Sequence, residues 1–265
     1  MEKFELLARA KKGQDLIVRD DQFEYNSILD AAKSCRDQGH RLSLVDSGKL
    51  TVYELEWLGE AGADLYTSDR ARSDEREITL VNQACRKGGA VVAYLHRGAI
   101  EGPDKTDLIS LSSLKELGRS GIYLYLSNKE RQRQLFEMTE LAFSARKGGS
   151  WLVYYHHGTL EAELESLAAN GAWIHLADSS LASEENLFLF LDIVHAAIDA
   201  GTNCVLHLER GVAVDWLQDI FDAGALILFK IALADYRSPL KVLERKANKR
   251  KLDFKNYYLY PKLFI

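Results

Sequence analysis

One segment of the chain occurs twice, sixty residues apart. Residues 86–101 read RKGGAVVAYLHRGAIE, and residues 146–161 read RKGGSWLVYYHHGTLE. Each copy has the pattern of a helix end, a glycine pair that stops the helix, an apolar strand, and a strand end of the form His-x-Gly. Because an internal repeat implies repeated structural units, this feature constrains the fold more strongly than composition does.

The repeated unit contains two kinds of strand. One kind begins directly after a glycine, and the other ends in a polar-x-Gly sequence; helical stretches separate them, which is typical of parallel βαβ units. Four such pairs of strands predict a (β/α)8 TIM-like barrel built from four βαβα repeats. A ninth strand candidate, which begins at Ala225, leaves open an α/β solenoid with nine parallel strands.

Charge separates the end of the chain from the rest. Residues 241–262 contain eight basic and two acidic side chains, whereas the remaining sequence contains 26 basic and 37 acidic ones. We therefore expect a single α/β barrel domain over residues 1–240 and a basic-aromatic tail over residues 241–265. The tail is expected to dock on the body or on a partner subunit in a homodimer. The acidic body argues against nucleic-acid binding, and RNA binding through the basic-aromatic tail is the less favoured alternative to docking.

The cysteines and the N-terminus favour a cytoplasmic protein. Cys35, Cys85 and Cys204 form no C-x-x-C spacing and are too few for a disulfide framework. Residues 1–5 lack the apolar segment of a signal peptide, and no apolar run approaches the length that spans a bilayer. No contact with a membrane is expected.

The predicted strands divide their side chains between two faces, because neighbouring residues point in opposite directions. The face assigned to the helices is apolar, as at Val91, Ala93 and Leu95. The face assigned to the barrel interior carries tyrosine and histidine, whose buried polar atoms need partners, so a small-molecule ligand is expected there. The residues expected to contact this ligand are Tyr66, Tyr94, Tyr125, Tyr154, His175, Arg97, Arg210 and Lys230.

Four metal-competent side chains stand where the polar-x-Gly strands end. Asp46, His96, His156 and Glu209 are predicted to occupy equivalent positions around the barrel axis. Imidazoles and carboxylates suit a divalent metal such as Zn²⁺, Mn²⁺ or Fe²⁺, which would activate water or polarise a carbonyl. The predicted acid/base residue beside this metal is His157 or His207, and His175 and His207 are expected to orient the ligands from one layer deeper.

The first copy of the repeat resembles a segment of one enzyme family. His96-Arg97-Gly98, followed by Pro103 and Thr106, is similar to the His-Arg-Gly…Pro-Glu-Asn-Thr segment of glycerophosphodiester phosphodiesterases, which are also (β/α)8 barrels. The family's glutamate and asparagine are replaced by Asp104 and Lys105, and its next acidic pair by Tyr123 and Tyr125. The chain is therefore not assigned to this family.

Two functions follow as hypotheses. The first is a metal-assisted barrel enzyme, of hydrolase or lyase/isomerase type, which acts on a small polar or phosphorylated metabolite at the carboxyl ends of the strands. The alternative is a non-catalytic barrel or solenoid that binds a ligand or protein through an aromatic-lined face. A bound metal would favour the first hypothesis, and an open sheet of nine strands would favour the second.

Overall fold

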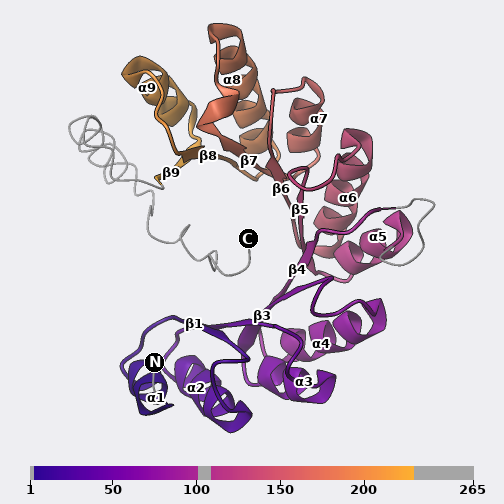
Figure 1. The fold of residues 1–265 in the computed structure, drawn as a ribbon, viewed down its shortest axis with the longest axis vertical. Helices are drawn as coiled ribbons and strands as arrows, with labels where there is room; N and C mark the ends of the chain where they lie inside the picture. The colour runs from indigo at the N-terminus through magenta and orange to yellow at the C-terminus, as the bar shows by residue number, and fades with distance from the viewer. Residues whose placement is uncertain (1–2, 101–108, 230–265) are drawn as a thin grey trace. The chain divides into compact units, whose positions relative to one another are not determined.

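The computed structural model describes residues 3–100 and 109–229 of the chain. Strands and helices alternate throughout these residues (Figure 1). The strands are β1 (Leu16–Arg19), β2 (Leu42–Val45), β3 (Ala63–Ser68), β4 (Val92–His96), β5 (Tyr123–Ser127), β6 (Leu152–His156), β7 (Trp173–Ala177), β8 (Cys204–Leu208) and β9 (Leu226–Phe229). Lys230 and the predicted tail over residues 241–265 lie outside the described residues.

A helix follows almost every strand. The helices are α1 (Lys3–Lys11), α2 (Tyr25–Asp37), α3 (Val52–Glu60), α4 (Glu75–Lys87), α5 (Leu111–Arg119), α6 (Leu135–Gly148), α7 (Glu163–Ala169), α8 (Glu184–Asp199) and α9 (Val214–Ala223), with a short 3-10 turn η1 (Asp178–Ser180) after β7. Within the described ranges, none of them combines the length and the apolar character needed to cross a membrane.

The strands form one parallel sheet. Its order is β1 to β9 in sequence order, and each recorded pairing is parallel. The predicted α/β fold of parallel strands is confirmed, and the ninth strand predicted at Ala225 belongs to the same sheet. Residue contacts divide the chain into two compact units, the first containing β1 to β4 and the second β6 to β9, with the boundary inside β5.

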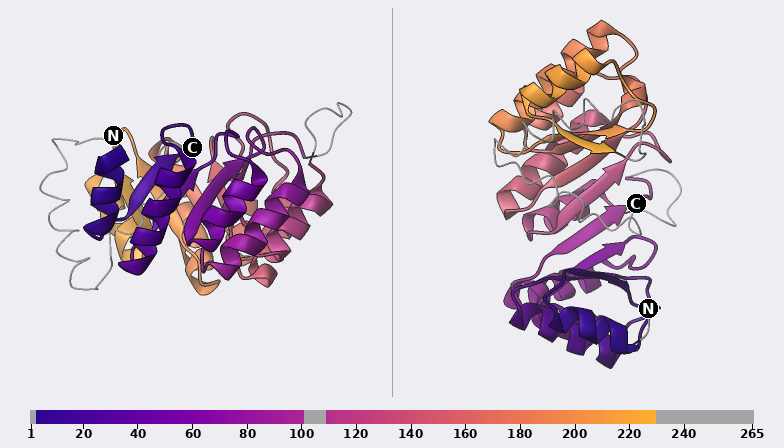
Figure 2. Two further views of the ribbon diagram at one scale, coloured as in Figure 1. Left: turned by 90° about the horizontal axis from the view of Figure 1, so that it is seen from below. Right: turned by 90° about the vertical axis from the view of Figure 1, so that its left-hand side faces the viewer.

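In the first unit, helices α1 to α4 lie on one side of the strands (Figures 1 and 2). The strand register aligns Val18, Leu44, Leu65 and Val92 in one row, and each is at most 3% exposed. Alternate residues such as Tyr66 and Ser68 remain partly exposed. The deeply buried row therefore belongs to the side covered by the helices, called here the helix face, and the alternate residues form the opposite face.

The second unit has the same two faces. Tyr154, Ile174 and Cys204 align in one fully buried row, and His156, Leu176 and Leu206 align in the next row of the same helix face. Tyr155, His175 and Val205 align on the opposite face. Helices α6 to α9 cover the first of these faces (Figure 1).

The glycine pair of the repeat has a packing role in both copies. A Cβ atom on Gly88 would lie 2.0 Å from the carbonyl oxygen of Gly59, and one on Gly148 would lie 2.2 Å from that of Gly118. These positions therefore require glycine, because the end of one helix touches the backbone of the preceding helix. The second glycine of each pair, Gly89 or Gly149, has a positive φ and turns the chain into the next strand.

A capping box starts α3, as the sequence Thr51-Val52-Tyr53-Glu54 predicts. The Thr51 hydroxyl accepts a hydrogen bond from the Glu54 amide, and the Glu54 carboxylate accepts one from the Thr51 amide at 2.8 Å. Two backbone donors that a helix start leaves unpaired are thereby satisfied.

Candidate functional site

A polar side chain directly after each of four strands holds the turn that follows the next strand. The Asp20 carboxylate accepts hydrogen bonds from the Ser47 and Lys49 amides, and Asp69 accepts from Arg97 and Gly98 at 2.7 and 2.6 Å. Such a carboxylate satisfies amides that a tight turn leaves free. We call this side chain the turn clamp; its four members are Asp20, Asp69, Asn128 and Asp178.

The turn clamps are not among the site residues predicted from the sequence. Asp178 accepts three backbone amides with one oxygen, at 2.6 to 2.9 Å, from the Glu209-Arg210-Gly211 turn. In the second His-x-Gly turn the clamp is Asn128, whose Oδ1 accepts from the His157 amide at 2.7 Å while its Nδ2 donates to the His157 carbonyl. All four clamps stand at the same place after their strands, and this shared spacing was the available signal.

His96 lies between its clamp and its own turn. Its side chain is 1% exposed, with Nδ1 3.1 Å from the Asp69 carboxylate and Nε2 3.2 Å from the Ala99 carbonyl oxygen. An imidazole that faces an acceptor with both nitrogens is suited to be an imidazolium. Burial raises the pKa of Asp69, but hydrogen bonds from His96, Gly98 and Arg97 outweigh burial and leave that pKa below its ordinary value.

His156 occupies the same place in the second copy but has a different partner. Its Nε2 lies 2.7 Å from the Thr159 carbonyl oxygen, and its Nδ1 lies 3.4 Å from the Asn128 amide nitrogen. Because the Asn128 nitrogen is a donor, the facing imidazole nitrogen acts as an acceptor, and the ring is suited to be neutral.

Asp46, the first predicted metal ligand, forms a buried ion pair. Its carboxylate accepts from the Thr67 hydroxyl at 2.8 Å, from Nε of Arg72 at 2.9 Å and from the Gly48 amide. The Asp46 side chain is fully buried, and Arg72 is 11% exposed. A charged hydrogen-bond network of this kind fixes the loop after β3 against the end of β2.

The turn clamps correct the predicted equivalence of the four metal candidates. The first amide held by each clamp belongs to Ser47, Arg97, His157 or Glu209. The residues just before these amides are Asp46, His96, His156 and Leu208, so the fourth equivalent position holds leucine rather than Glu209. Aligning the polar-x-Gly sequences displaced the fourth strand by one residue, and a shift of one residue exchanges the two faces of a strand.

The four predicted metal ligands divide between the two units. Asp46 and His96 belong to the first unit, and His156 and Glu209 belong to the second. Asp46, His96 and His156 contact the protein groups named above, and the Glu209 amide donates to Asp178. No three His, Cys, Asp or Glu side chains among residues 3–100 and 109–229 form a group that could hold a metal.

The opposite face of the second unit brings two predicted residues together. His175 of β7 and His207 of β8 approach with Nδ1 2.9 Å from Nε2. His175 is buried, whereas His207 is partly exposed. One ring therefore donates a hydrogen bond to the other, and only His207 of the pair reaches the surface.

The surroundings of this histidine pair keep its inner member neutral. Burial, and next the neighbouring His207, lower the pKa of His175 well below its ordinary value. The Tyr155 ring packs beside both imidazoles, with centroids 4.2 Å from His175 and 6.0 Å from His207. The three side chains form one aromatic cluster on the opposite face of β6, β7 and β8.

The other predicted ligand contacts are scattered. Tyr94 and Tyr154 lie on the helix face at 1% exposure, which corrects their predicted place in the barrel interior. Tyr66 lies on the opposite face, where burial and the nearby Asp64 raise its pKa to about 12. Tyr125 is buried in β5.

The predicted rim residues divide between backbone and surface roles. The amides of Arg97 and Arg210 donate to Asp69 and Asp178, and the Arg210 side chain is exposed. The predicted catalytic residue His157 is also exposed, and its amide donates to Asn128. Of these, Arg210 belongs to the same strand end as His207.

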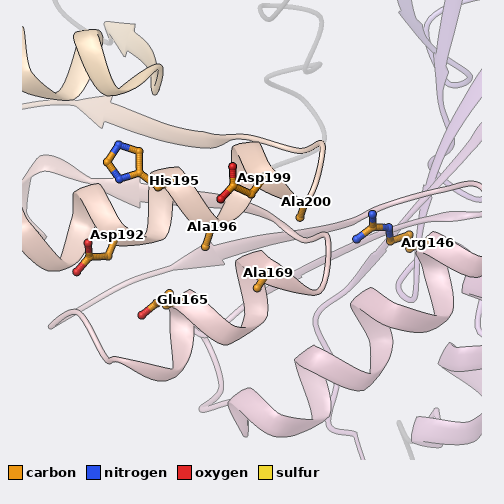
Figure 3. Close-up of a pocket in the computed structure, with 8 residues that line it drawn as sticks. All are labelled: Arg146, Glu165, Ala169, Asp192, His195, Ala196, Asp199 and Ala200. Carbon is orange, nitrogen blue, oxygen red and sulfur yellow. The ribbon is translucent and has the colours of Figure 1, made fainter.

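A polar groove of about 450 Å³ lies between α6, α7 and α8 of the second unit (Figure 3). Arg146 lies at one end of this groove, and Glu165 and Asp192 lie at the other. His195 and Asp199 complete its charged lining, and all five side chains are exposed. The groove is on the helices rather than on the opposite face, so it is separate from the histidine pair.

The sequence matches no protein-family model and no curated protein. Solved structures with a similar course of the chain include a type I 3-dehydroquinate dehydratase from Clostridium difficile, at 15% identity and a TM-score of 0.38 over 88% of this chain and 94% of that one. An HpcH/HpaI aldolase from Desulfitobacterium hafniense DCB-2 has 11% identity and a TM-score of 0.36, over 94% and 95% of the two chains. At these values the likeness carries no information about activity.

Proposed function

We propose that this chain is an enzyme of lyase or isomerase type that moves a proton on a small polar molecule at the opposite face of β6 to β8. His207 is the general acid/base, and His175 is the residue that positions it. The observation that carries the proposal is the 2.9 Å contact between a buried imidazole and a partly exposed one.

The proton arrangement follows from burial. His175 does not take up a proton readily, because burial disfavours its charged form. When Nε2 of His207 donates to Nδ1 of His175, Nδ1 of His207 is left as the base. Protonation of that nitrogen makes His207 an imidazolium whose Nε2–H bond is already directed at an acceptor. General acid–base catalysis by such a group contributes roughly 10²- to 10⁴-fold to a rate.

One neighbouring feature supports a polar, anionic substrate, and a second bounds the site. The exposed Arg210 side chain follows β8, the strand that carries His207, and a guanidinium binds carboxylate or phosphate. The Tyr155 ring provides a flat apolar surface beside both imidazoles. A small phosphorylated or carboxylated metabolite is therefore the proposed substrate class, and a cytoplasmic location accompanies it because the three cysteines are free thiols.

Metal assistance by Zn²⁺, Mn²⁺ or Fe²⁺ is a separate proposal that rests on the residue types of Asp46, His96, His156 and Glu209 taken singly, because no three of them form a metal-binding group among the described residues. Elemental analysis of untagged protein, with the His156→Ala variant beside it, tests this proposal. Near-stoichiometric metal that disappears in the variant supports it, and metal-free protein in both preparations contradicts it.

The histidine pair is tested before any substrate is known. Imidazole ¹⁵N chemical shifts of the labelled protein at about pH 5 are expected to show His175 neutral and His207 charged. Independent protonation of both rings would contradict the pair. In a screen of phosphorylated and carboxylated metabolites, His207→Gln is expected to lower kcat by roughly 10²-fold or more with KM nearly unchanged.

His195→Gln is the matched control for this screen, because His195 is an exposed histidine of α8 outside the proposed site. Its kcat is expected to equal that of the wild type. A kcat in His207→Gln equal to that of the wild type would exclude the proposed role. Ligand binding without turnover, lost in Tyr155→Ala, would instead favour the non-catalytic binding function.

A further inference from the structure

We infer that the outer surface of helices α3 and α4 is the contact through which two copies of this chain associate about a two-fold axis. The surface belongs to the first unit and is independent of the proposed histidine site. At the centre of this surface lie Tyr53 and Trp57 of α3 and Leu80 of α4. These three side chains are called here the α3–α4 patch.

The α3–α4 patch consists of large apolar side chains that are exposed. Tyr53 is 65% exposed, Trp57 51% and Leu80 49%. The two aromatic rings lie 5.7 Å apart at an angle of 56°, so they present one continuous apolar surface. A groove of about 190 Å³ runs among them. Large aromatic residues that gather on a surface mark contacts with other proteins.

The internal repeat shows that the fold does not require this patch. When the sequences of α3 and α5 are aligned at their shared Leu-Gly pair, Tyr53 corresponds to Ser112 and Trp57 to Glu116. When α4 and α6 are aligned at Arg-Lys-Gly-Gly, Leu80 corresponds to Glu140. All three counterparts are polar and exposed. Tyr53, Trp57 and Leu80 therefore stand where the equivalent helices carry polar side chains, and the exposed Phe136 and Phe143 of α6 stand at other positions.

The charges around the patch favour a second copy of this chain as the partner. The groove is lined at one side by Glu56 and Glu60 of α3 and at the other by Lys87 of α4. Lys87 contacts Glu60 of its own chain at 3.3 Å, yet it is 72% exposed and has further donor capacity. Because a two-fold axis places the same surface on both sides, Glu56 of each copy can face Lys87 of the other. A patch that carries both signs is complementary to itself.

Sedimentation of the full chain over a range of concentrations tests the association. The wild type is expected to dimerise, and Trp57→Glu is expected to raise the dimer dissociation constant at least roughly thirtyfold, the effect of losing a central aromatic contact. Phe188→Glu on α8 is the matched control, because Phe188 is 58% exposed and lies outside the patch. It is expected to dimerise like the wild type, and equal melting temperatures establish that both variants fold.

Charge exchange and crosslinking locate the contact. Glu56→Lys is expected to weaken the dimer, and the double variant Glu56→Lys with Lys87→Glu is expected to restore it. In a mixture of ¹⁴N- and ¹⁵N-labelled protein, a zero-length carbodiimide crosslinker is expected to join Glu56 of a chain with one label to Lys87 of a chain with the other label. The Glu60–Lys87 link within a chain is the internal standard.

Three results would overturn the inference. They are a wild type that stays monomeric at all concentrations, a Trp57→Glu dimer as tight as the wild type, or crosslinks between isotopes that involve only residues 241–265. The last result would place the dimer contact in the basic-aromatic tail predicted from the sequence.

Discussion

The two His-x-Gly turns have nearly the same sequence, but their clamps differ by one functional group. His96 faces the Asp69 carboxylate at 3.1 Å, whereas His156 faces the Asn128 amide nitrogen at 3.4 Å. Both rings reach the carbonyl three residues ahead with Nε2. In the first turn the ring therefore faces a carboxylate and in the second an amide, although the backbone requirement is the same. The repeat thus preserves the turn and leaves its electrostatics free to vary.

The largest effect is expected from removing each clamp. Asp69→Ala leaves two turn amides and the His96 ring without their acceptor, so the free energy of unfolding is expected to fall by about 3 kcal/mol. Asn128→Ala is expected to cost about 1–2 kcal/mol, because only neutral hydrogen bonds are lost. Urea unfolding of both variants measures the difference, and equal losses would contradict the contrast between the two turns.

The pH dependence of stability separates the contribution of the Asp69 charge from that of hydrogen bonds which an uncharged side chain of the same shape can also accept. The folded state lowers the Asp69 pKa below its ordinary value of 3.8, so its stabilisation is complete above that value and is lost as the pH falls through the lowered pKa. The Asp69→Asn variant lacks this contribution. In urea unfolding, the free energy of unfolding of the wild type is expected to exceed that of Asp69→Asn by an amount that shrinks from about pH 6 to about pH 3. An advantage that does not change with pH would show that the charge contributes nothing.

The smallest effect is expected from converting the second turn into the first. Asn128→Asp gives His156 a carboxylate partner but removes the amide donor to the His157 carbonyl. The two changes offset each other, so stability is expected to change by less than about 1 kcal/mol. Imidazole ¹⁵N shifts at about pH 7 are expected to show both His156 nitrogens protonated in the variant and one in the wild type. A ring that stays neutral would mean that the partner does not control its charge.

Much of the fold could be predicted from the sequence because its signals are local. The glycine pair, the capping box at Thr51 and Glu54, and the alternation of apolar strands with helices each act over a few residues. The predicted strands and the parallel sheet are confirmed for the described residues. The prediction of His175 and His207 as site residues depended on the same alternation along single strands.

The position of the metal candidates was harder to predict. Their equivalence required an alignment between strands, and the glycine of the fourth turn stands one residue further on than in the other turns. Asp69 and Asn128 were not predicted because a clamp follows one strand and its partners follow the next, so no pattern within a single strand identifies it.

The sequence by itself determined the repeating units, the ends of several helices and the parallel sheet, because propensity, capping and period-two alternation are properties of short segments. Tertiary structure alone decided which side chains share a face and which polar groups meet. It placed Tyr94 and Tyr154 under the helices, gave Leu208 rather than Glu209 the fourth equivalent position, and set His175 beside His207. The physical reason is that a shift of one residue in strand register changes few local contacts but exchanges the two faces of the strand.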